Sequence, residues 1–262
     1  MQIVIDKSYL QGVATEAIQR LCEEHTVLLT ETLFYEILTA TESVQRACFA
    51  KLSVRENPVV LIPCVGPLLR YEIEHRQAAF PLIDYRLPFT VEFNPQLSTG
   101  TFRHPLTEEE TLAQWRKEVQ HEVETFHLGA TEVAAWCPEL RELSSDARRT
   151  ACEDLKQQTG VDVDAVRNIY QSLQGLEGFP PASLLNSSWV LFRWVQVQLL
   201  FALDYVSRYG FSEPAAIPKR VEHDVHDIQY VIFGSLCGAL ATRDGDVARN
   251  FTRACLEGTL LS

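Results

Sequence analysis

The stretch that decides the fold is His223-Asp224-Val225-His226-Asp227, followed by the apolar run 228–241 and by Thr242-Arg243-Asp244-Gly245-Asp246. Within the apolar run, Ile228, Val231, Ile232, Ser235 and Leu236 have the i, i+3, i+4 spacing of a helix that buries one face. Gly238 predicts the end of that helix, and residues 239–242 read as a short buried strand. The stretch therefore predicts a helix followed by a strand.

Acidic residues flank this unit on both sides. Asp224 and Asp227 lie three positions apart, so a helix that they open places both on one face. Asp244 follows the predicted strand directly. In an open α/β sheet, ligands bind beyond the carboxyl ends of the strands. We therefore expect partners for these acids elsewhere in the chain.

The N-terminal part supplies them. Residues 2–6 predict a strand that ends in Asp6, and residues 26–30 predict a second strand. A helix is expected after each, over 13–24 and over 31–40, and Glu36 lies in the second. This strand-helix alternation is typical of a parallel sheet flanked by helices. Residues 58–63 add a possible edge strand, because prolines bracket them.

The middle of the chain reads as mostly α-helical. Prolines recur over 65–105, where a helix is expected at 68–79. Further helices are expected at 107–127, 131–136, 138–159, 162–173 and 182–209, before a linker at 213–218. We therefore predict an α/β protein with one sheet built from both chain ends, residues 1–64 and 210–262. Residues 65–209 would form a helical insertion or cap.

Composition narrows the class of protein. The seven cysteines are scattered without a CxxC pair, and no signal peptide is visible, which favours a cytoplasmic protein with reduced thiols. Polar residues interrupt the most apolar segment, 189–206, so no membrane span is expected. The formal net charge of −12 argues against a protein that coats nucleic acid non-specifically.

Five carboxylates are expected to converge if the strands are adjacent: Asp6, Glu36, Asp224, Asp227 and Asp244. Oxygen ligands of this kind suit Mg²⁺ or Mn²⁺, and without a cation the acids would repel one another. Each acid also has a plainer interpretation. Asp6 and Asp224 could be helix N-caps, Glu36 a solvated helix residue and Asp244 part of a turn, while Asp246 is expected to cap the last helix.

The strand ending in Asp6, the glutamate in 33–38, the helix start at Asp227 and the Thr242-Arg243-Asp244 sequence together resemble the PIN-like nucleases. The resemblance covers about residues 1–50 and 217–262. It implies catalytic roles for Asp6, Glu36, Asp227 and Asp244, with Thr242 as a supporting hydroxyl.

The same resemblance implies metal-dependent phosphodiester hydrolysis, usually of RNA, with Mg²⁺ or Mn²⁺ as cofactor. Asp6, Asp227 and Asp244 would hold the metal, and Asp224 is an additional acid one turn before Asp227. Glu36 or Asp224 could hold a second cation or orient the attacking water. Lys219, Arg220 and Arg243 could meet substrate phosphates, or they could be solvated charges that balance the acids.

Two other interpretations remain open. The stretch His223-Asp224-Val225-His226-Asp227 contains a His-Asp pair, as used by metal-dependent phosphohydrolases of the HD type together with an upstream histidine and a downstream aspartate. Those enzymes are all-helical, and His121 or His127 would have to be the upstream ligand. Alternatively, the chain is a catalytically inactive PIN-like binding or scaffolding protein. Its helical region would then contact a protein partner or a second copy of the chain.

Overall fold

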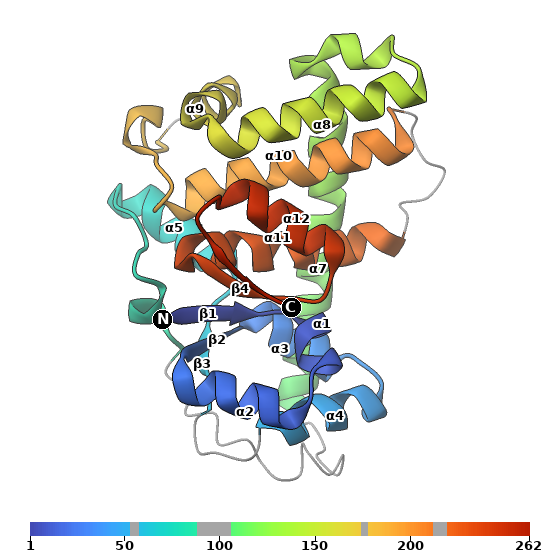
Figure 1. The fold of residues 1–262 in the computed structure, drawn as a ribbon. Coiled ribbons are helices and arrows are strands. Elements are labelled where there is room, and N and C mark those ends of the chain that lie inside the picture. Colours follow the sequence, from blue (N-terminus) through green and yellow to red (C-terminus); the bar gives the residue numbers. More distant parts are fainter. Residues whose placement is uncertain (53–57, 88–105, 174–177, 212–218) are drawn as a thin grey trace.

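A five-stranded, all-parallel sheet lies at the centre of the protein in a computed structural model (Figure 1), which describes residues 1–52, 58–87, 106–173, 178–211 and 219–262. The strands are β1 (Gln2–Ile5), β2 (Thr26–Thr30), β3 (Val60–Ile62), β4 (Ala239–Ala241) and β5 (Thr259–Leu261), and their order in the sheet is β3-β2-β1-β4-β5. The expected α/β class and the sheet built from both chain ends are confirmed. The proline-bracketed strand lies at a sheet edge, as predicted.

The register brings the two chain ends together at the centre of the sheet. Val4 pairs with Leu240 and Ile5 with Ala241, and the Asp6 amide donates to the Ala241 carbonyl at 3.1 Å. Because the strands are parallel, their carboxyl ends share one edge. Asp6 and Thr242 therefore meet there, although 236 positions separate them.

Helices cover both faces of the sheet, above and below it in Figure 1. One face carries α2 (Thr15–Glu24) and α3 (Glu31–Leu38), with α1 (Lys7–Gly12) and α4 (Glu42–Leu52) packed beside them. The other face carries α11 (Lys219–Cys237), which α12 (Gly245–Ala254) contacts. This cover leaves Ile3, Val4 and Ile5 fully buried, as expected for a central parallel strand.

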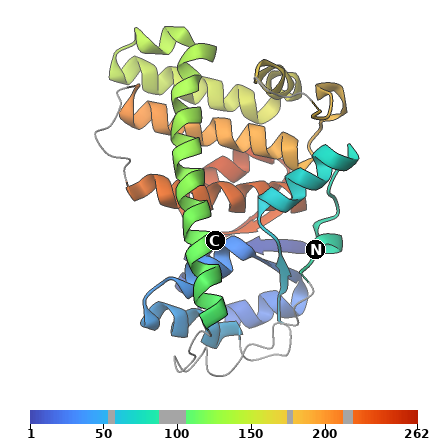
Figure 2. The same ribbon diagram turned by 180° about the vertical axis from the view of Figure 1, so that it is seen from behind.

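The helical region packs on α11. It consists of α5 (Val65–His75), α7 (Leu106–Trp136), α8 (Ser145–Val161), α9 (Val163–Ser172) and α10 (Val190–Tyr209), with short 3₁₀ turns at Leu82–Tyr85, Pro138–Arg141 and Ala182–Leu184. The long α7 runs past the side of the sheet and up to α8 (Figure 2), and α10 contacts α7, α8 and α11. Buried apolar side chains are continuous from β1 to α10. The predicted division at residues 64 and 210 therefore concerns chain connectivity, while the apolar core is shared.

Several predicted boundaries are wrong. The helices expected at 107–127 and 131–136 are one helix, because Phe126, Ala130 and Val133 continue a single buried face. The segment 138–159 is a 3₁₀ turn followed by α8, which begins after its N-cap Ser144. Asp224 does not open its helix, because α11 already begins at Lys219 and buries Val221.

The remaining predictions concern the linker, the proline-rich segment, the cysteines and membrane spans. The linker at 213–218 and the prolines at 88–105 lie outside the described residues. None of the seven cysteines, all of which lie in the described ranges, forms a disulfide. Among the helices of the described ranges, none has both the length and the apolar character that a bilayer crossing requires.

Candidate functional site at the carboxyl edge of the sheet

Asp6 is fixed where β1 passes into α1. Its Oδ1 accepts a hydrogen bond from the Tyr9 amide at 2.7 Å, which makes it the N-cap of α1. The hydroxyl of Ser8 lies 2.9 Å from both carboxylate oxygens, and the Thr242 hydroxyl donates to Oδ2. Burial raises the pKa of Asp6, and these hydrogen bonds counteract part of that rise. The N-cap interpretation is confirmed, and it also aims the carboxylate at β4.

Thr242 links Asp6 to Asp244. Its hydroxyl oxygen accepts from the Asp244 amide at 3.0 Å while its proton goes to Asp6. Asp244 in turn caps α12 by accepting from the amides of Asp246, at 2.7 Å, and Val247, at 3.2 Å. The supporting role expected for Thr242 thus has a hydrogen-bonding basis in this structure.

The expectation that Asp246 caps the last helix is wrong, because Asp244 occupies that position. Asp246 lies in the first turn of α12 and pairs with Arg208, at 3.0 Å, and with Arg249. Its charge is therefore compensated by arginines, away from the acids of the sheet edge.

Glu36 points inward from α3 and is 7% exposed, so the solvated interpretation is wrong. The Tyr230 hydroxyl donates to Oε2, while His226 Nδ1 and Lys7 Nζ lie 3.3 Å and 3.6 Å from Oε1. Burial alone would raise the pKa of Glu36. The contacts with His226, Tyr230 and Lys7 outweigh it and hold the pKa below its usual value. Glu36 is therefore an ionised carboxylate with hydrogen-bonding partners and Lys7 as a counter-charge.

Asp227 lacks, within the described part of the chain, the kind of hydrogen-bonding and charged partners that surround Glu36. Among the described residues, none donates a hydrogen bond to its carboxylate or forms an ion pair with it. Burial raises its pKa well above the usual value, and repulsion from Asp244, Glu36, Asp224 and Asp6 adds to that rise. The structure thus brings all five predicted acids close enough to interact. We refer to Asp6, Glu36, Asp224, Asp227 and Asp244 as the carboxylate cluster.

Asp224 lies one turn before Asp227 on α11 and is buried. Its charge is one of those that raise the pKa of Asp227. The N-cap interpretation is wrong, because α11 has already begun before Asp224. Asp224 is therefore a member of the carboxylate cluster.

The donor types of the cluster fit a hard divalent cation, because every donor is a carboxylate oxygen and Asp227 has no counter-charge among the described residues. Their present positions fit it less well. In the part of the chain that the structure describes, no group of three or more His, Cys, Asp or Glu side chains is arranged to hold a metal ion. Asp6 and Glu36 turn oxygens toward Thr242 and Tyr230 instead, so a cation would have to replace some of these contacts.

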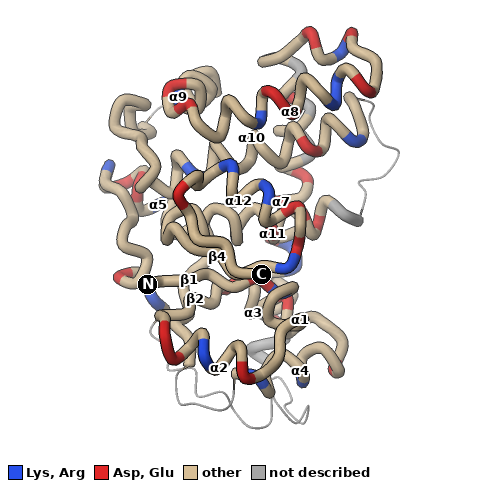
Figure 3. The backbone as a smooth tube through the Cα atoms, in the orientation of Figure 1, with Lys and Arg blue, Asp and Glu red and all other residues tan. Residues whose placement is uncertain are grey.

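The predicted phosphate-binding cations are only partly placed. The side chains of Lys219 and Arg220 lie outside the described part. Arg243 is exposed, but its guanidinium donates to the Gly12 carbonyl at 2.6 Å, which ties it to the end of α1. Figure 3 shows acidic and basic segments interspersed along the helices.

Sequence reasoning missed Lys7, Ser8 and Tyr230. A serine two positions after an N-cap aspartate is a local signal that could have identified Ser8. Lys7 and Tyr230 have no such signal, because their contacts with Glu36 depend on the packing of α1, α3 and α11.

The histidines of the opening stretch also differ from each other. His223 is exposed, whereas His226 is buried against Glu36. The parallel sheet does not fit the all-helical architecture that the HD interpretation requires.

Comparisons with known proteins add no family. The chain matches no protein-family model, no curated protein and no solved structure.

Proposed function

We propose that this protein is a metal-dependent phosphodiesterase of PIN-like type, a cytoplasmic ribonuclease that uses the carboxylate cluster. The observation that carries the proposal is Asp227. Its half-buried carboxylate lies among four other acids and has no compensating partner among the described residues. Buried acids in folded proteins are normally paired or hydrogen-bonded, and the exceptions concentrate at functional sites.

The place of the cluster supports the same proposal. It lies beyond the carboxyl ends of β1 and β4, neighbouring strands at the centre of a parallel sheet. Ligands of open α/β folds bind at this edge. Acids from α3, α11 and the ends of two strands meet there, so the site depends on the whole fold.

The residues of the site would have different roles in the proposed reaction. Thr242, Ser8 and the Tyr9 amide orient Asp6, while Tyr230, His226 and Lys7 orient Glu36. Burial and the neighbouring acids raise the pKa of Asp227 well above its usual value, so its carboxyl holds a proton at pH values where an ordinary aspartate has lost it. Bound Mg²⁺ or Mn²⁺ would lower the pKa of water and offset charge on the scissile phosphate.

The test is cleavage of a mixed pool of RNA and single-stranded DNA with Mg²⁺, with Mn²⁺ and with chelator. The same samples are assayed for stabilisation by Mn²⁺, because a bound ion raises the melting temperature. Asp227→Asn removes the charge at the centre of the cluster. Asp146→Asn is the matched control, since Asp146 is 92% exposed on the distant α8.

We expect divalent-dependent cleavage of RNA that Asp227→Asn abolishes and Asp146→Asn preserves. If the wild type neither cleaves nucleic acid nor is stabilised by Mn²⁺, the proposal is wrong. If DNA alone is cleaved, the ribonuclease part is wrong.

A binding or scaffolding protein without catalysis is the second candidate. One observation favours it: Asp6 and Glu36 are already satisfied by partners within the chain. An inactive module needs no cation and would keep these contacts. Unchanged Asp6 and Glu36 environments on adding Mn²⁺, together with absent cleavage, would support this candidate.

A further inference from the structure

A pocket lies beside the carboxylate cluster, between α3, the start of α5, and α7. This polar pocket has a volume of about 570 Å³, within the range of small-molecule sites. His226 forms part of its wall and also lies 3.3 Å from Glu36. The pocket and the carboxylate cluster therefore share a wall.

Aromatic rings line the pocket from its outer part to that wall. The Trp115 and Tyr35 rings are 5.8 Å apart at 77°, and the Tyr35 and His226 rings are 6.1 Å apart at 79°. Edge-to-face contacts of this kind hold the rings in place. Flat, rigid surfaces of this type accept a planar ring by stacking.

The polar lining is rich in hydrogen-bond acceptors. Glu31, Glu118 and Glu122 contribute carboxylates, while Arg70 and Lys117 contribute cations. Glu122 Oε2 accepts from Gln229 Nε2 at 3.4 Å, so most of its acceptor capacity is unused in the contacts of the described residues. The pocket is therefore suited to a planar ligand that donates N–H groups.

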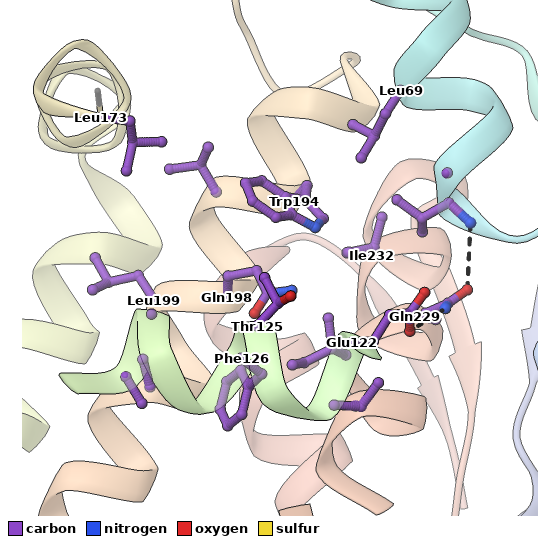
Figure 4. A pocket seen from close by; sticks show the side chains of 18 of the residues that line it. Leu69, Glu122, Thr125, Phe126, Leu173, Trp194, Gln198, Leu199, Gln229 and Ile232 are labelled. Carbon is purple, nitrogen blue, oxygen red and sulfur yellow. Dashed lines mark hydrogen bonds between the residues drawn. The ribbon is translucent and has the colours of Figure 1, made fainter. Parts of the chain in front are cut away.

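Gln229 and Glu122 separate this polar pocket from a second, apolar cavity of about 350 Å³. Figure 4 shows that cavity, with Gln229 and Glu122 close together and apolar side chains such as Trp194, Leu69 and Ile232 around it. Gln229 is fixed in place, because its Oε1 accepts from the Thr32 hydroxyl at 2.7 Å and from the Val65 amide at 3.3 Å. Hydrogen bonds thus hold Gln229 in place, and Gln229 in turn contacts Glu122 in the polar pocket.

His226, on the side toward the cluster, has a buried ring nitrogen that makes no hydrogen bond within the described residues. Its Nδ1 lies 3.3 Å from Glu36 Oε1 without hydrogen-bond geometry, whereas its Nε2 has no hydrogen-bond partner there, although the side chain is only 7% exposed. A buried polar atom in this state is costly and calls for a partner. This observation is independent of the carboxylates that line the pocket.

We propose that the polar pocket binds one nucleobase of the substrate, with preference for guanine. This inference rests on the proposed nuclease function, because it places the base beside the phosphate that the carboxylate cluster would receive. Guanine donates two adjacent N–H groups to a single carboxylate, whereas uracil presents one N–H group between two carbonyl oxygens that acidic side chains repel. Stacking beside Trp115 and Tyr35 holds the ring.

The test is binding of guanosine and uridine to the full-length protein, measured by ligand-observed NMR at neutral pH without divalent ions. Nucleosides carry no phosphate, so the readout reports the base and the sugar alone. We expect guanosine to bind about ten-fold more tightly than uridine, the order of discrimination that a two-hydrogen-bond contact gives.

Variants on one helix provide the matched comparison. Glu122→Gln should remove the preference for guanosine, whereas Glu132→Gln, an exposed position on the same helix α7, should preserve it. Trp115→Ala should weaken guanosine binding about ten-fold by loss of stacking, and Trp115→Phe should retain most of it. Asp227→Asn should bind guanosine as the wild type does.

Equal binding of the two nucleosides, or no binding of either, overturns the inference. Cleavage of RNA without guanosine binding would show that the guanine-binding inference is wrong and would leave the proposed nuclease function in place. Guanosine binding without cleavage of RNA and without stabilisation by Mn²⁺ would show that the proposed nuclease function is wrong, whereas the polar pocket would still bind a nucleobase.

Discussion

Two regions of the molecule surround a carboxylate in opposite ways. Where α5 meets α10, Glu72 is fully buried and accepts from the amides of Ala79, Val190 and Leu191 at 2.9, 2.8 and 2.7 Å. At the sheet edge, Asp227 is surrounded by acids and has no hydrogen bond or ion pair from the described residues. The first acid joins two helices, whereas the second is destabilising unless something binds to it. The difference separates structural acids from candidate ligands better than burial does.

The largest effect is expected at the structural acid. Glu72→Ala leaves three buried amides without an acceptor, two of them at the start of α10. We expect a loss of about 3–5 kcal/mol in the free energy of unfolding, measured by urea denaturation. Glu72→Gln keeps one acceptor oxygen at the same length and should lose clearly less. Equal losses in both variants would show that side-chain volume, not the amide contacts, stabilises the junction.

The next largest effect is expected at Tyr230, which contacts Glu36 of the carboxylate cluster. Tyr230→Phe removes the hydroxyl that donates to buried Glu36 and leaves the ring in place. Loss of a hydrogen bond to a charged group should cost about 1.5–3 kcal/mol of stability. It should also raise the pKa of Glu36, which carboxyl-selective NMR titration can follow. An unchanged Glu36 titration would contradict the contact.

Asp227→Asn should act in the other direction and stabilise the protein without divalent ions, by about 0.5–2 kcal/mol at neutral pH. The folded-state pKa of Asp227 is raised, so the folded protein binds more protons than the unfolded chain above the normal aspartate pKa. Wild-type stability should therefore fall as pH rises from that value through the raised pKa. Asparagine removes this dependence.

The same variant sharpens the comparison with Glu72. Mn²⁺ should stabilise the wild type and have little effect on Asp227→Asn. Thermal denaturation across a pH series, with and without Mn²⁺, measures both effects. A variant less stable than the wild type at every pH would show that Asp227 is a structural acid after all.

The smallest effect on stability is expected at Asp244, which combines both roles. Asp244→Ala removes the N-cap of α12 and should cost about 1 kcal/mol, while Asp244→Asn keeps a capping side chain and should cost little. Both variants should lose stabilisation by Mn²⁺, as measured by thermal denaturation. Retained Mn²⁺ stabilisation in Asp244→Asn would restrict Asp244 to capping.

Local patterns were sufficient to predict much of the fold. The central strands follow from short apolar runs, and the positions of Asp6 and Asp244 follow from the ends of those runs. The helix expected at 162–173 is present as α9, and Asp162 is its N-cap, which accepts from the amides of Asp164 and Ala165. These features depend on residues that are close in sequence, so local sequence patterns predict them.

The missed features depend on distant packing or on very short segments. The helices α1 and α4 and the strand β5 were not predicted; α1 has six residues and β5 has three, too few for a periodic signal. The difference between Glu36 and Asp227 could not be predicted either. It arises from contacts such as that of Tyr230 with Glu36, which 194 positions separate.

The pairing of β1 with β4 also constrains when the site can form. Asp6 is synthesised well before the hydroxyl that orients it, which belongs to a residue 236 positions later. Until β4 emerges from the ribosome, β1 lacks its central neighbour and the N-terminal acids face no partner from α11 or α12. A nascent chain would therefore carry half a site throughout the synthesis of its helical region. The carboxylate cluster would be assembled only after β4 and α12 have been synthesised.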